Sequence, residues 1–415
     1  MQLCIFEDIK YNQFYPLTYS RPVYDLVCGI STLKEKIIRE FPSYKYSLYC
    51  RKYLEEIVRS QNPGVEVNTI QTDSCLFING RVLGTADFPK LFSNEGDDEC
   101  IFKSGKEVAA VKLSGSNLES FKNNPGDYLD FSSLPNVPVR NVEVKLYNYL
   151  WEMISDNGNE ITSDADHLRK HGTFNIHPEE YVGVHLINQD KIYIRQNVTI
   201  KPGVVIDATN GPVYIDENAF IFPNAVIEGP ACIGKGTIIK SSATIYENVS
   251  IGDVCKVGGE VEDSIFLPYS NKQHAGFIGH SYLGSWVNLG ADTNCSDLKN
   301  NYSKVKVTLN GKTVDTGSQF LGVIMGDHSK TAINTMFNTG TVVGFSSNIF
   351  CAGFPPKFIP SFSWGGAEGL APYDLTKGIE TAKFVTARRS LQFSPVFEKL
   401  FENIFNLTSS ERNND

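Results

Sequence analysis

Branched apolar residues recur at every sixth position through part of the second half of the chain. Each of them follows a small or β-branched residue by two positions, and Pro, Gly, Asn and Asp fill the intervals. The series consists of Ile221, Ile227, Ile233, Ile239, Ile245, Ile251 and Val257. A period of six fits neither an α-helix nor a two-faced strand. It predicts a triangular coil of short strands and tight turns, in which stacked repeats bury one another's apolar faces.

The repeat predicts a left-handed parallel β-helix over residues 191–360. The frame starts at Val198 and Val204, and a three-residue insertion across 207–216 keeps the later repeats in phase. An ordinary β-sandwich would not hold one frame over seven consecutive repeats. Beyond Ile265 the register loosens and a loop projects at 267–276, followed by further coils and a Pro-rich exit. Chemistry is usually inserted where a repeat is interrupted in this way.

The rest of the chain has a different pattern. Residues 1–155 alternate strand-like and helix-like segments, which predicts an α/β domain with a parallel sheet and a helix at about 143–155. The polar residues that follow predict a connector over 156–190. Residues 361–415 form a predicted helical tail, with apolar residues at helical spacing between Ile379 and Ile404. We expect the tail to pack on the β-helix or on a neighbouring subunit.

Composition narrows the classes of partner. A net charge of −9 argues against a nucleic acid or an anionic membrane as the partner. No apolar run approaches the ~18 residues of a membrane-spanning helix, and acidic residues in the first segment argue against a signal peptide. The nine cysteines form no CxxC pair, which favours free thiols in a reducing cytoplasm over zinc binding or disulfides.

Two segments of the first domain resemble the sugar-1-phosphate nucleotidyltransferases. The string PLTYSRP, with Thr18 and Arg21, is similar to the second half of their phosphate loop, and CLFINGR is similar to the strand that ends at their metal-binding Asp. The glycine-rich first half of the loop is absent, and Arg81 replaces the Asp after Asn79 and Gly80. Nucleotidyl transfer needs close backbone approach to phosphate and a metal ion that neutralises charge.

The resemblance therefore implies a domain that binds a nucleotide or sugar phosphate. An arginine at the metal position is able to hold a phosphate as a fixed cation. Mg²⁺ would need another carboxylate, such as Asp8 or Asp25, and the metal ligands are unknown. The residues that this resemblance assigns to nucleotide or sugar-phosphate binding are Thr18, Arg21, Asn79, Gly80 and Arg81.

Nearly the whole chain resembles the GlmU-like family, which includes the bifunctional N-acetylglucosamine-1-phosphate uridylyltransferase/glucosamine-1-phosphate acetyltransferases. The string SNKQHAGFIGHSYLGSWVNLGA carries this resemblance in the β-helix, and counting by its glycines places His274 at the family's catalytic histidine. A neutral imidazole suits the removal of a proton from an attacking amine. The resemblance implies acetyl-CoA as co-substrate and a homotrimer with its active sites between neighbouring β-helices.

Other positions follow from the same resemblance. His280 and His328 are expected to have structural roles. Tyr246 and Glu262 stand where relatives place cations for the sugar phosphate, and Lys256 and Lys272 are the nearest replacements, which leaves the acceptor sugar open. Asn300 lies in the same loop as the Asn-Tyr pair that closes over the sugar. The predicted substrate-binding residues are Lys272, Phe277, Asn288, Asn301, Tyr302 and Asn334.

Three functions are compatible with these observations. The first is acetyl-CoA-dependent N-acetylation of an amino-sugar phosphate by the β-helix, within nucleotide-sugar synthesis. The second is a sugar-1-phosphate nucleotidyltransferase whose β-helix serves for assembly. The third is a non-catalytic scaffold that binds nucleotide sugars, which Arg81 and the missing glycines favour.

Overall fold

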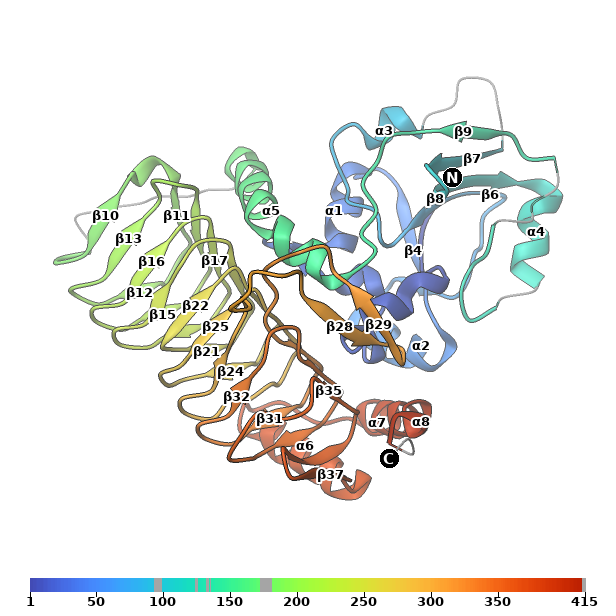
Figure 1. Cartoon of the computed structure of the whole chain (residues 1–415). Helices are drawn as coiled ribbons and strands as arrows, with labels where there is room; N and C mark the ends of the chain where they lie inside the picture. The colour runs from blue at the N-terminus through green and yellow to red at the C-terminus, as the bar shows by residue number, and fades with distance from the viewer. Residues whose placement is uncertain (93–98, 124–125, 132–133, 135, 172–180, 413–415) are drawn as a thin grey trace.

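The computed structural model describes residues 1–92, 99–123, 126–131, 134, 136–171 and 181–412. An α/β domain is followed by a long helix, a parallel β-helix and a carboxy-terminal pair of helices (Figure 1). The fold class predicted from the sequence, an α/β nucleotidyltransferase-like domain and a left-handed parallel β-helix, is confirmed. None of the helices in the described part of the chain is long and apolar enough to cross a membrane.

The first domain is built on a seven-stranded sheet in the order β5-β4-β1-β6-β8-β7-β9. Its strands are β1 (Gln2–Phe6), β4 (Lys45–Tyr49), β5 (Glu66–Val67), β6 (Ser74–Asn79), β7 (Cys100–Ser104), β8 (Glu107–Ser114) and β9 (Val139–Asn141). β1 pairs in parallel with β4 and β6, but β8 pairs antiparallel with both β6 and β7. The prediction of a parallel sheet is therefore correct for the first strands and wrong for β8.

Short helices surround this sheet. They are α1 (Leu33–Glu40), α2 (Glu55–Gln61), α3 (Phe88–Leu91) and α4 (Gly115–Asn123), and a small hairpin of β2 (Val27–Cys28) and β3 (Ser31–Thr32) precedes α1. The side chain of Thr32 accepts from the backbone N–H of Glu35, whose carboxylate accepts from the backbone of Thr32. This capping box fixes where α1 begins.

A single helix, α5 (Leu150–His171), connects the two large parts of the chain. The sequence predicted a helix at about 143–155 and a connector from 156. The observed helix begins and ends later than this prediction, and it occupies the first part of the predicted connector. Asn157 and Asp164 are polar yet fully buried, because they bind the first domain on one side of the helix. Residues 172–180 of the predicted connector lie outside the described residues.

The β-helix has three flat faces, each a stack of short strands (Figure 1). Within the faces the strands pair in parallel, except β37 at the end of face 3, which pairs antiparallel with β36. Face 1 contains β10 (His185–Ile187), β13 (Val205–Asp207), β16 (Val226–Glu228), β19 (Thr244–Ile245), β22 (Glu260–Glu262) and β25 (Phe277–Gly279), followed by the pair β27 (Asn294–Cys295) and β32 (Met336–Phe337). Face 2 contains β11 (Ile192–Ile194), β14 (Val213–Ile215), β17 (Ala231–Ile233), β20 (Val249–Ile251), β23 (Ile265–Phe266), β26 (Tyr282–Leu283), β30 (Ile324–Met325), β33 (Val342–Val343) and β35 (Phe358–Ile359). Face 3 contains β12 (Thr199–Ile200), β15 (Phe220–Ile221), β18 (Ile238–Ile239), β21 (Lys256–Val257) and β24 (Asn271–Lys272), followed by β31 (Lys330–Thr331), β34 (Asn348–Ile349), β36 (Ser363–Gly366) and β37 (Gly369–Pro372).

The predicted sixfold ladder forms the core of this β-helix. Ile221 pairs in register with Ile239, and Ile239 with Val257, so residues eighteen apart stack on one face. All members of the series are buried within one continuous apolar cluster. Burial of apolar surface between coils stabilises the stack, because no single coil encloses its own side chains.

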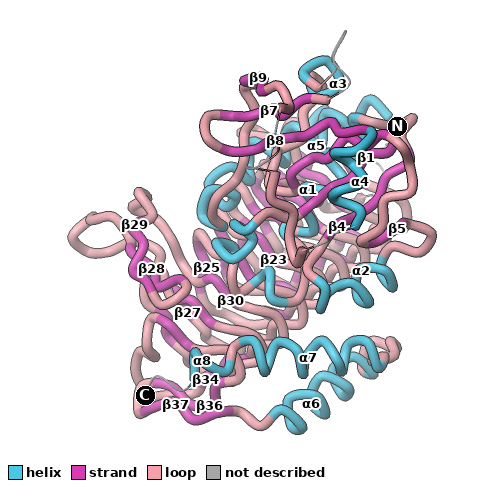
Figure 2. Tube along the Cα trace, turned by 90° about the vertical axis from the view of Figure 1, so that its right-hand side faces the viewer, coloured by secondary structure: helices cyan, strands magenta, loops and turns pink. Residues whose placement is uncertain are grey.

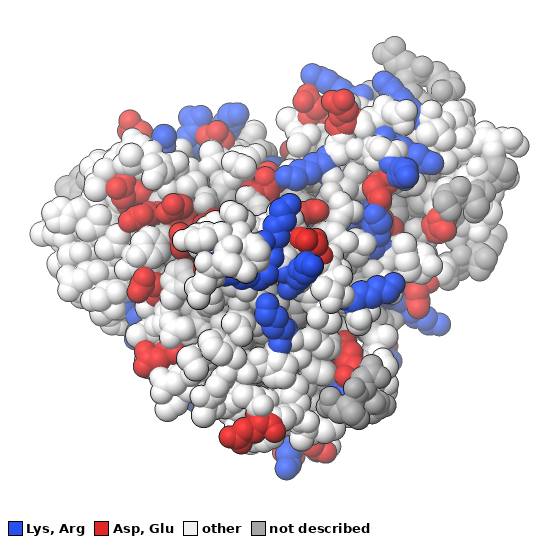
Figure 3. Space-filling model, viewed as in Figure 1, with Lys and Arg blue, Asp and Glu red and all other residues white. Residues whose placement is uncertain are grey.

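One insertion interrupts the coils. Between face 1 and face 2 the chain leaves the helix after β27 and returns at β30, forming the hairpin of β28 (Lys306–Leu309) and β29 (Lys312–Asp315). At the tip, the side-chain amide of Asn310 donates to the backbone carbonyl of Asn12 at 3.0 Å. Lys and Arg side chains gather near the middle of the face that Figure 3 shows, where the two large parts of the molecule meet.

The first domain covers face 2 of the β-helix. The hydroxyl of Tyr282 accepts from the backbone N–H of Val27 at 2.9 Å and donates to its carbonyl at 2.8 Å. The hydroxyl of Ser250 donates to the carbonyl of Gly29 at 2.7 Å. Apolar residues of both parts share one buried cluster, which includes Trp151. The first domain therefore leaves faces 1 and 3 of the β-helix uncovered.

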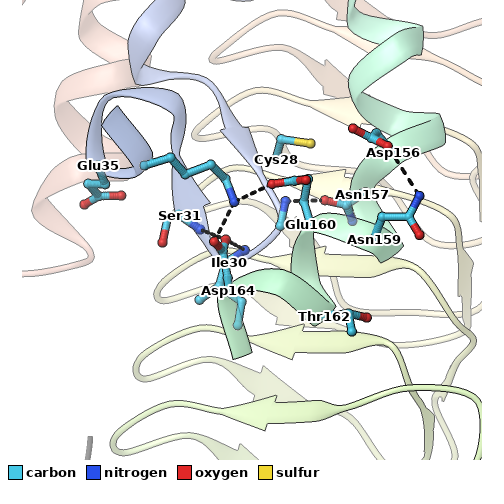
Figure 4. A network of polar contacts seen from close by, with 12 residues as sticks. Cys28, Ile30, Ser31, Glu35, Asp156, Asn157, Asn159, Glu160, Thr162 and Asp164 are labelled. Carbon is cyan, nitrogen blue, oxygen red and sulfur yellow. Dashed lines mark hydrogen bonds and ion pairs between the residues drawn. The ribbon is translucent and has the colours of Figure 1, made fainter. Parts of the chain in front are cut away.

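Helix α5 is tied to the first domain by a buried polar network (Figure 4). The Nζ of Lys36, a fully buried side chain of α1, lies 2.8 Å from the Glu160 carboxylate and 2.6 Å from that of Asp164. The Asp164 carboxylate also accepts from the backbone N–H groups of Ile30 and Ser31. These charges are buried but paired, which is the condition under which burial of charge is tolerated.

The tail forms two helices, α6 (Leu375–Ala387) and α7 (Pro395–Leu407), and a short α8 (Ser409–Arg412). The sequence predicted one helix, and two residues explain the break: Ser390 has a left-handed backbone, and Pro395 fits only the first turn of a helix. The prediction that the tail packs on the β-helix is confirmed (Figure 2), because Phe401 contacts Phe345 and Phe362. Helix α7 of the tail also contacts α2 of the first domain.

Candidate functional site

His274 lies at the corner between face 3 and face 1. It follows β24 and precedes β25, and its side chain is exposed. The loop predicted to project at 267–276 is instead part of a regular, shorter coil, because β24 pairs in register with β21. The corners of successive coils stack here: the N–H of Asp292 donates to the carbonyl of Ala275, and that of Asn334 to the carbonyl of Ala291. A substrate that touches His274 would therefore also reach the next two coils, since coils are spaced by about 4.8 Å.

Two of the predicted substrate-binding residues belong to this corner. Asn334 has a left-handed backbone and an exposed side chain two coils above His274. Asn288 is exposed on face 3, where it bridges Asn271 and Lys330 in the stack of strands. His274 and Asn334 thus lie at the corner between faces 3 and 1, and Asn288 lies beside it on face 3, on the coil between them. We define these three residues as the His274 corner.

The remaining predicted residues of the β-helix lie elsewhere. Phe277 is half-buried at the start of β25 on face 1, next to the corner, and its N–H donates to the side chain of Asn294. Asn301 and Tyr302 are exposed in the insertion that follows β27. Since His274 precedes the face 1 strand and Tyr302 follows one, the two lie at opposite ends of that face within one chain.

Lys272 is buried, although the sequence suggested a substrate contact. Its side chain is 1% exposed, and it stacks on Val257 of the interior column. The ammonium group donates to the carbonyls of Gly258 at 2.8 Å and His274 at 3.1 Å, so it holds the loop that carries His274. Its position follows from a short coil: Val257 and Lys272 are fifteen residues apart, not eighteen, yet are in register.

The burial of Lys272 predicts a specific pH dependence of stability. Burial lowers the pKa of its ammonium to about 8, below the 10.5 of an exposed lysine. The unfolded chain therefore binds more protons than the folded chain between these values, so stability rises with pH across that window. We expect the free energy of unfolding of the wild type to increase from about pH 8 to pH 10 relative to Lys272→Met. Urea unfolding at several pH values measures this, and parallel curves for the two proteins would contradict it.

The residues assigned to nucleotide binding in the first domain are largely buried. Asn79 and Arg81 are both fully buried at the end of β6, and Gly80 lies against the ring of Tyr24. The hydroxyl of Thr18 donates to the carbonyl of Tyr11, inside the same domain. Thr18, Asn79 and Arg81 are therefore packed inside the first domain instead of facing a ligand site.

Arg81 is neutralised by carboxylates of its own domain. Its guanidinium contacts Asp8 at 2.6 Å and Glu107 at 2.8 Å, and it donates to the carbonyl of Tyr147. Lys10 and Arg81 hydrogen-bond to Glu107 and lower the pKa of its carboxyl, although partial burial opposes the shift. These partners leave Arg81 no open position for a phosphate.

The carboxylates proposed as alternative Mg²⁺ ligands do not fit that role. Asp8 pairs with Arg81 and caps the short helix that starts at Ile9, and Asp25 lies 2.6 Å from the ammonium of Lys34. No group of three or more His, Cys, Asp or Glu suited to a metal ion occurs within the described ranges. A cation already occupies the place that Mg²⁺ would need.

Arg21 lies apart from the other residues of the predicted nucleotide site. Its guanidinium and the hydroxyl of Ser20 both bind the carboxylate of Asp327, which lies at the corner between face 2 and face 3. The PLTYSRP string therefore joins the first domain to the β-helix. Neither motif matching nor spacing indicated this contact, because Arg21 and Asp327 are more than three hundred residues apart.

Sequence reasoning also missed an arrangement around His280. Its Nδ1 lies 2.8 Å from Asp297 and its Nε2 lies 3.6 Å from Asp263, while its ring stacks on Phe320. Burial opposes the charged form, but the hydrogen bond to Asp297 and the nearby carboxylates raise the pKa of His280 overall. Asp263 and Asp297 stand seventeen residues before and after His280, about one coil in each direction, which is the sequence signal that would have found them.

Comparisons with known proteins cover both parts of the chain. Residues 3–173 match a family model described as sugar nucleotidyl transferase. The bifunctional sugar-1-phosphate nucleotidylyltransferase/acetyltransferase of Sulfurisphaera tokodaii is 26% identical over 78% of this chain and 85% of its own length. The bifunctional protein GlmU of Methanocaldococcus jannaschii is 28% identical over 89% of each chain. Among solved structures, the UDP-N-acetylglucosamine acyltransferase from Campylobacter jejuni is 16% identical to this chain, with a TM-score of 0.21. The match covers 54% of this chain and 96% of that structure.

Proposed function

We propose that this chain is a GlmU-like protein, a transferase of UDP-N-acetylglucosamine-type nucleotide-sugar biosynthesis that N-acetylates an amino sugar phosphate with acetyl-CoA. The His274 corner carries this proposal. It presents an exposed imidazole and two exposed amide side chains on consecutive coils, in the interrupted part of the repeat. The relative from Sulfurisphaera tokodaii is a bifunctional sugar-1-phosphate nucleotidylyltransferase/acetyltransferase, and the relative from Methanocaldococcus jannaschii is a bifunctional GlmU protein.

The acetyl-transfer step assigns one role to each group. The amine of the sugar attacks the thioester carbonyl carbon of acetyl-CoA, and His274 removes the proton that the amine loses. The new C–N bond forms as the C–S bond breaks, and the CoA thiolate leaves and takes a proton from the imidazolium. Asn288 and Asn334 would orient the sugar, and backbone N–H groups of the coils after Gly326 would stabilise the oxyanion.

The nearest cations lie on face 3 rather than at His274 itself: Lys256 pairs in register with Asn271, whose side-chain oxygen accepts from Arg389 at 2.9 Å. Lys272 is withdrawn into the coil, and Glu260 and Phe277 stand on the neighbouring face 1 strands. Glucosamine-1-phosphate and unphosphorylated glucosamine are therefore the two acceptors to compare. Because acetyl-CoA and sugar phosphates are metabolites of the cytoplasm, we assign the reaction to that compartment.

Assembly of three copies would complete the site. Within one chain the corner is exposed, and Asn301 and Tyr302 lie at the far end of face 1. A neighbouring β-helix packed against this edge would supply the second wall that excludes water and would bring its own insertion to His274. A homotrimer is the assembly that the resemblance implies, and sedimentation analysis tests it.

We expect that the first domain does not catalyse Mg²⁺-dependent nucleotidyl transfer. Because Arg81 is paired and Thr18 and Asn79 are buried, UTP with Mg²⁺ should not raise the melting temperature of the protein. Thermal melts with UTP, with and without Mg²⁺, measure this directly. A Mg²⁺-dependent increase would contradict the prediction and favour the second candidate, a sugar-1-phosphate nucleotidyltransferase.

The experiment that tests the proposed function is thiol release from acetyl-CoA. We expect the full-length protein to release CoA thiol when an amino sugar is present, and a panel of glucosamine-1-phosphate, glucosamine and related amino sugars identifies the acceptor. No release above background with any of them would contradict the proposal. The β-helix would then serve for assembly or as a scaffold.

A further inference from the structure

Four cationic side chains gather on face 3 of the β-helix, where the end of α6 lies against it. Lys240 and Lys256 stand on successive coils of face 3, and Arg388 and Arg389 directly follow α6. The guanidinium of Arg389 donates to the side-chain oxygen of Asn271 at 2.9 Å, and Asn271 is the register partner of Lys256. This contact places the end of α6 beside Lys256. We define the four cationic residues as the face 3 cation cluster.

The members of this cluster repel one another and lack a compensating carboxylate. Burial lowers the pKa of the Lys256 ammonium, and the like charges of the other three members lower it further. Among the described residues, no carboxylate forms an ion pair with any member of the cluster. The buried cations Lys36, Arg51 and Arg81, by contrast, all contact carboxylates. The cluster is therefore a local positive site in a chain of net charge −9, and a bound anion would relieve its repulsion.

The composition of the cluster favours a phosphate group as this anion. A phosphate monoester carries a charge of about −1.5 to −2 near neutral pH and three acceptor oxygens, so it is able to contact several cations at once. Arginine binds phosphate through two parallel hydrogen bonds. The bond to Asn271 is the only hydrogen bond of the Arg389 side chain within the described ranges. It fixes the direction of the guanidinium and leaves the other N–H groups for a ligand.

The cluster adjoins the His274 corner. Asn271 precedes His274 by three residues, so their Cα atoms are at most about 11 Å apart. Asn271 also pairs with Asn288 of the corner on the next coil. A ligand whose phosphate lies at the cluster is therefore able to extend along face 3 to His274.

We propose that the face 3 cation cluster binds a phosphate group of a substrate that reaches the His274 corner. The identity of that substrate rests on the proposed function, since acetyl-CoA and an amino sugar phosphate both carry phosphate. The cluster takes the role in phosphate binding that Lys272, buried within the coil, does not fill. It consists of residues from two distant parts of the chain, the β-helix and the segment after α6.

Calorimetric titration of the full-length protein with acetyl-CoA and with glucosamine-1-phosphate, each alone, tests the proposal. We expect at least one of them to bind the wild type, and we expect Lys256→Gln and Arg389→Gln each to weaken its affinity by about tenfold, the usual effect of a lost hydrogen bond to a charged group. Neither substitution breaks an ion pair, so both variants should fold. The matched control is Lys201→Gln, which removes one positive charge from the same face but two coils before Lys240. It should bind like the wild type.

The two titrations distinguish the sources of the phosphate. A loss of affinity for acetyl-CoA alone assigns the cluster to acetyl-CoA, and a loss for glucosamine-1-phosphate alone assigns it to the acceptor. Binding of neither compound at millimolar concentrations, or equal affinities in the wild type and both variants, would overturn the inference. An equal loss in Lys201→Gln would also overturn it, because net charge and not the cluster would then be responsible. Since binding is measured without turnover, failure here is distinguishable from failure of the proposed function.

Discussion

Replacing His274 by Asn should lower the rate of acetyl transfer by about 10²–10⁴-fold, the usual contribution of a positioned general base. The amine must lose its proton as it attacks, and Asn keeps a polar side chain while removing the group that accepts the proton. Because the side chain of His274 is exposed, the substitution leaves the coil intact. Steady-state thiol release, with kcat and KM separated, measures the effect, and we expect the loss to fall on kcat.

A second histidine of the β-helix provides the control. His185 is exposed on β10, at the opposite end of face 1, so His185→Asn should leave the rate unchanged. Sedimentation of all three proteins verifies that assembly is the same. Equal rates for the wild type and His274→Asn would show that another group is the base, and His280 with its two carboxylates would be examined next.

Replacing Lys36 by Met should lower the free energy of unfolding by about 3–5 kcal/mol, the usual cost of removing one partner of a buried ion pair. Lys36 is fully buried between the carboxylates of Glu160 and Asp164, which connect α1 to α5 (Figure 4). Arg39 also contacts Asp164, but Glu160 would be left as a largely buried carboxylate without its cation. Urea unfolding followed by circular dichroism measures the change.

An exposed lysine gives the matched comparison. Lys399 lies 3.1 Å from Glu56 on the surface, with both side chains more than half exposed, and exposed pairs contribute little. Lys399→Met should therefore change stability by about 0.5 kcal/mol or less. If both substitutions have the same small effect, the buried network does not hold α5 to the first domain.

The β-helix was predictable because its pattern is local and repeated. Residues such as Ile239 and Val257 occupy equivalent places in successive coils, so spacing alone reveals that they stack. Lys272, which the resemblance suggested as a substrate contact, lies in the interior column because the coil before it is shorter. A periodic pattern gives the position of a residue only while the length of the coil stays constant.

The contacts between the parts of the chain were not predictable from the sequence. Arg81 finds Asp8 and Glu107, and Arg21 finds Asp327, across distances in the chain that no local pattern links. Polar residues of α5 such as Asn157 were interpreted as a connector because buried polar groups look like exposed ones in a sequence. The histidine of the His274 corner was identified only by its resemblance to a family.

The most direct test of the central claim follows the acetyl group itself. Acetyl-CoA labelled with ¹³C at the carbonyl is incubated with the protein and the acceptor found in the thiol assay, and the product is analysed by NMR. The proposed function predicts a labelled amide on the sugar nitrogen with the wild type and almost none with His274→Asn. Label that remains on CoA or appears only as free acetate would contradict acetyl transfer to an amino sugar at the His274 corner.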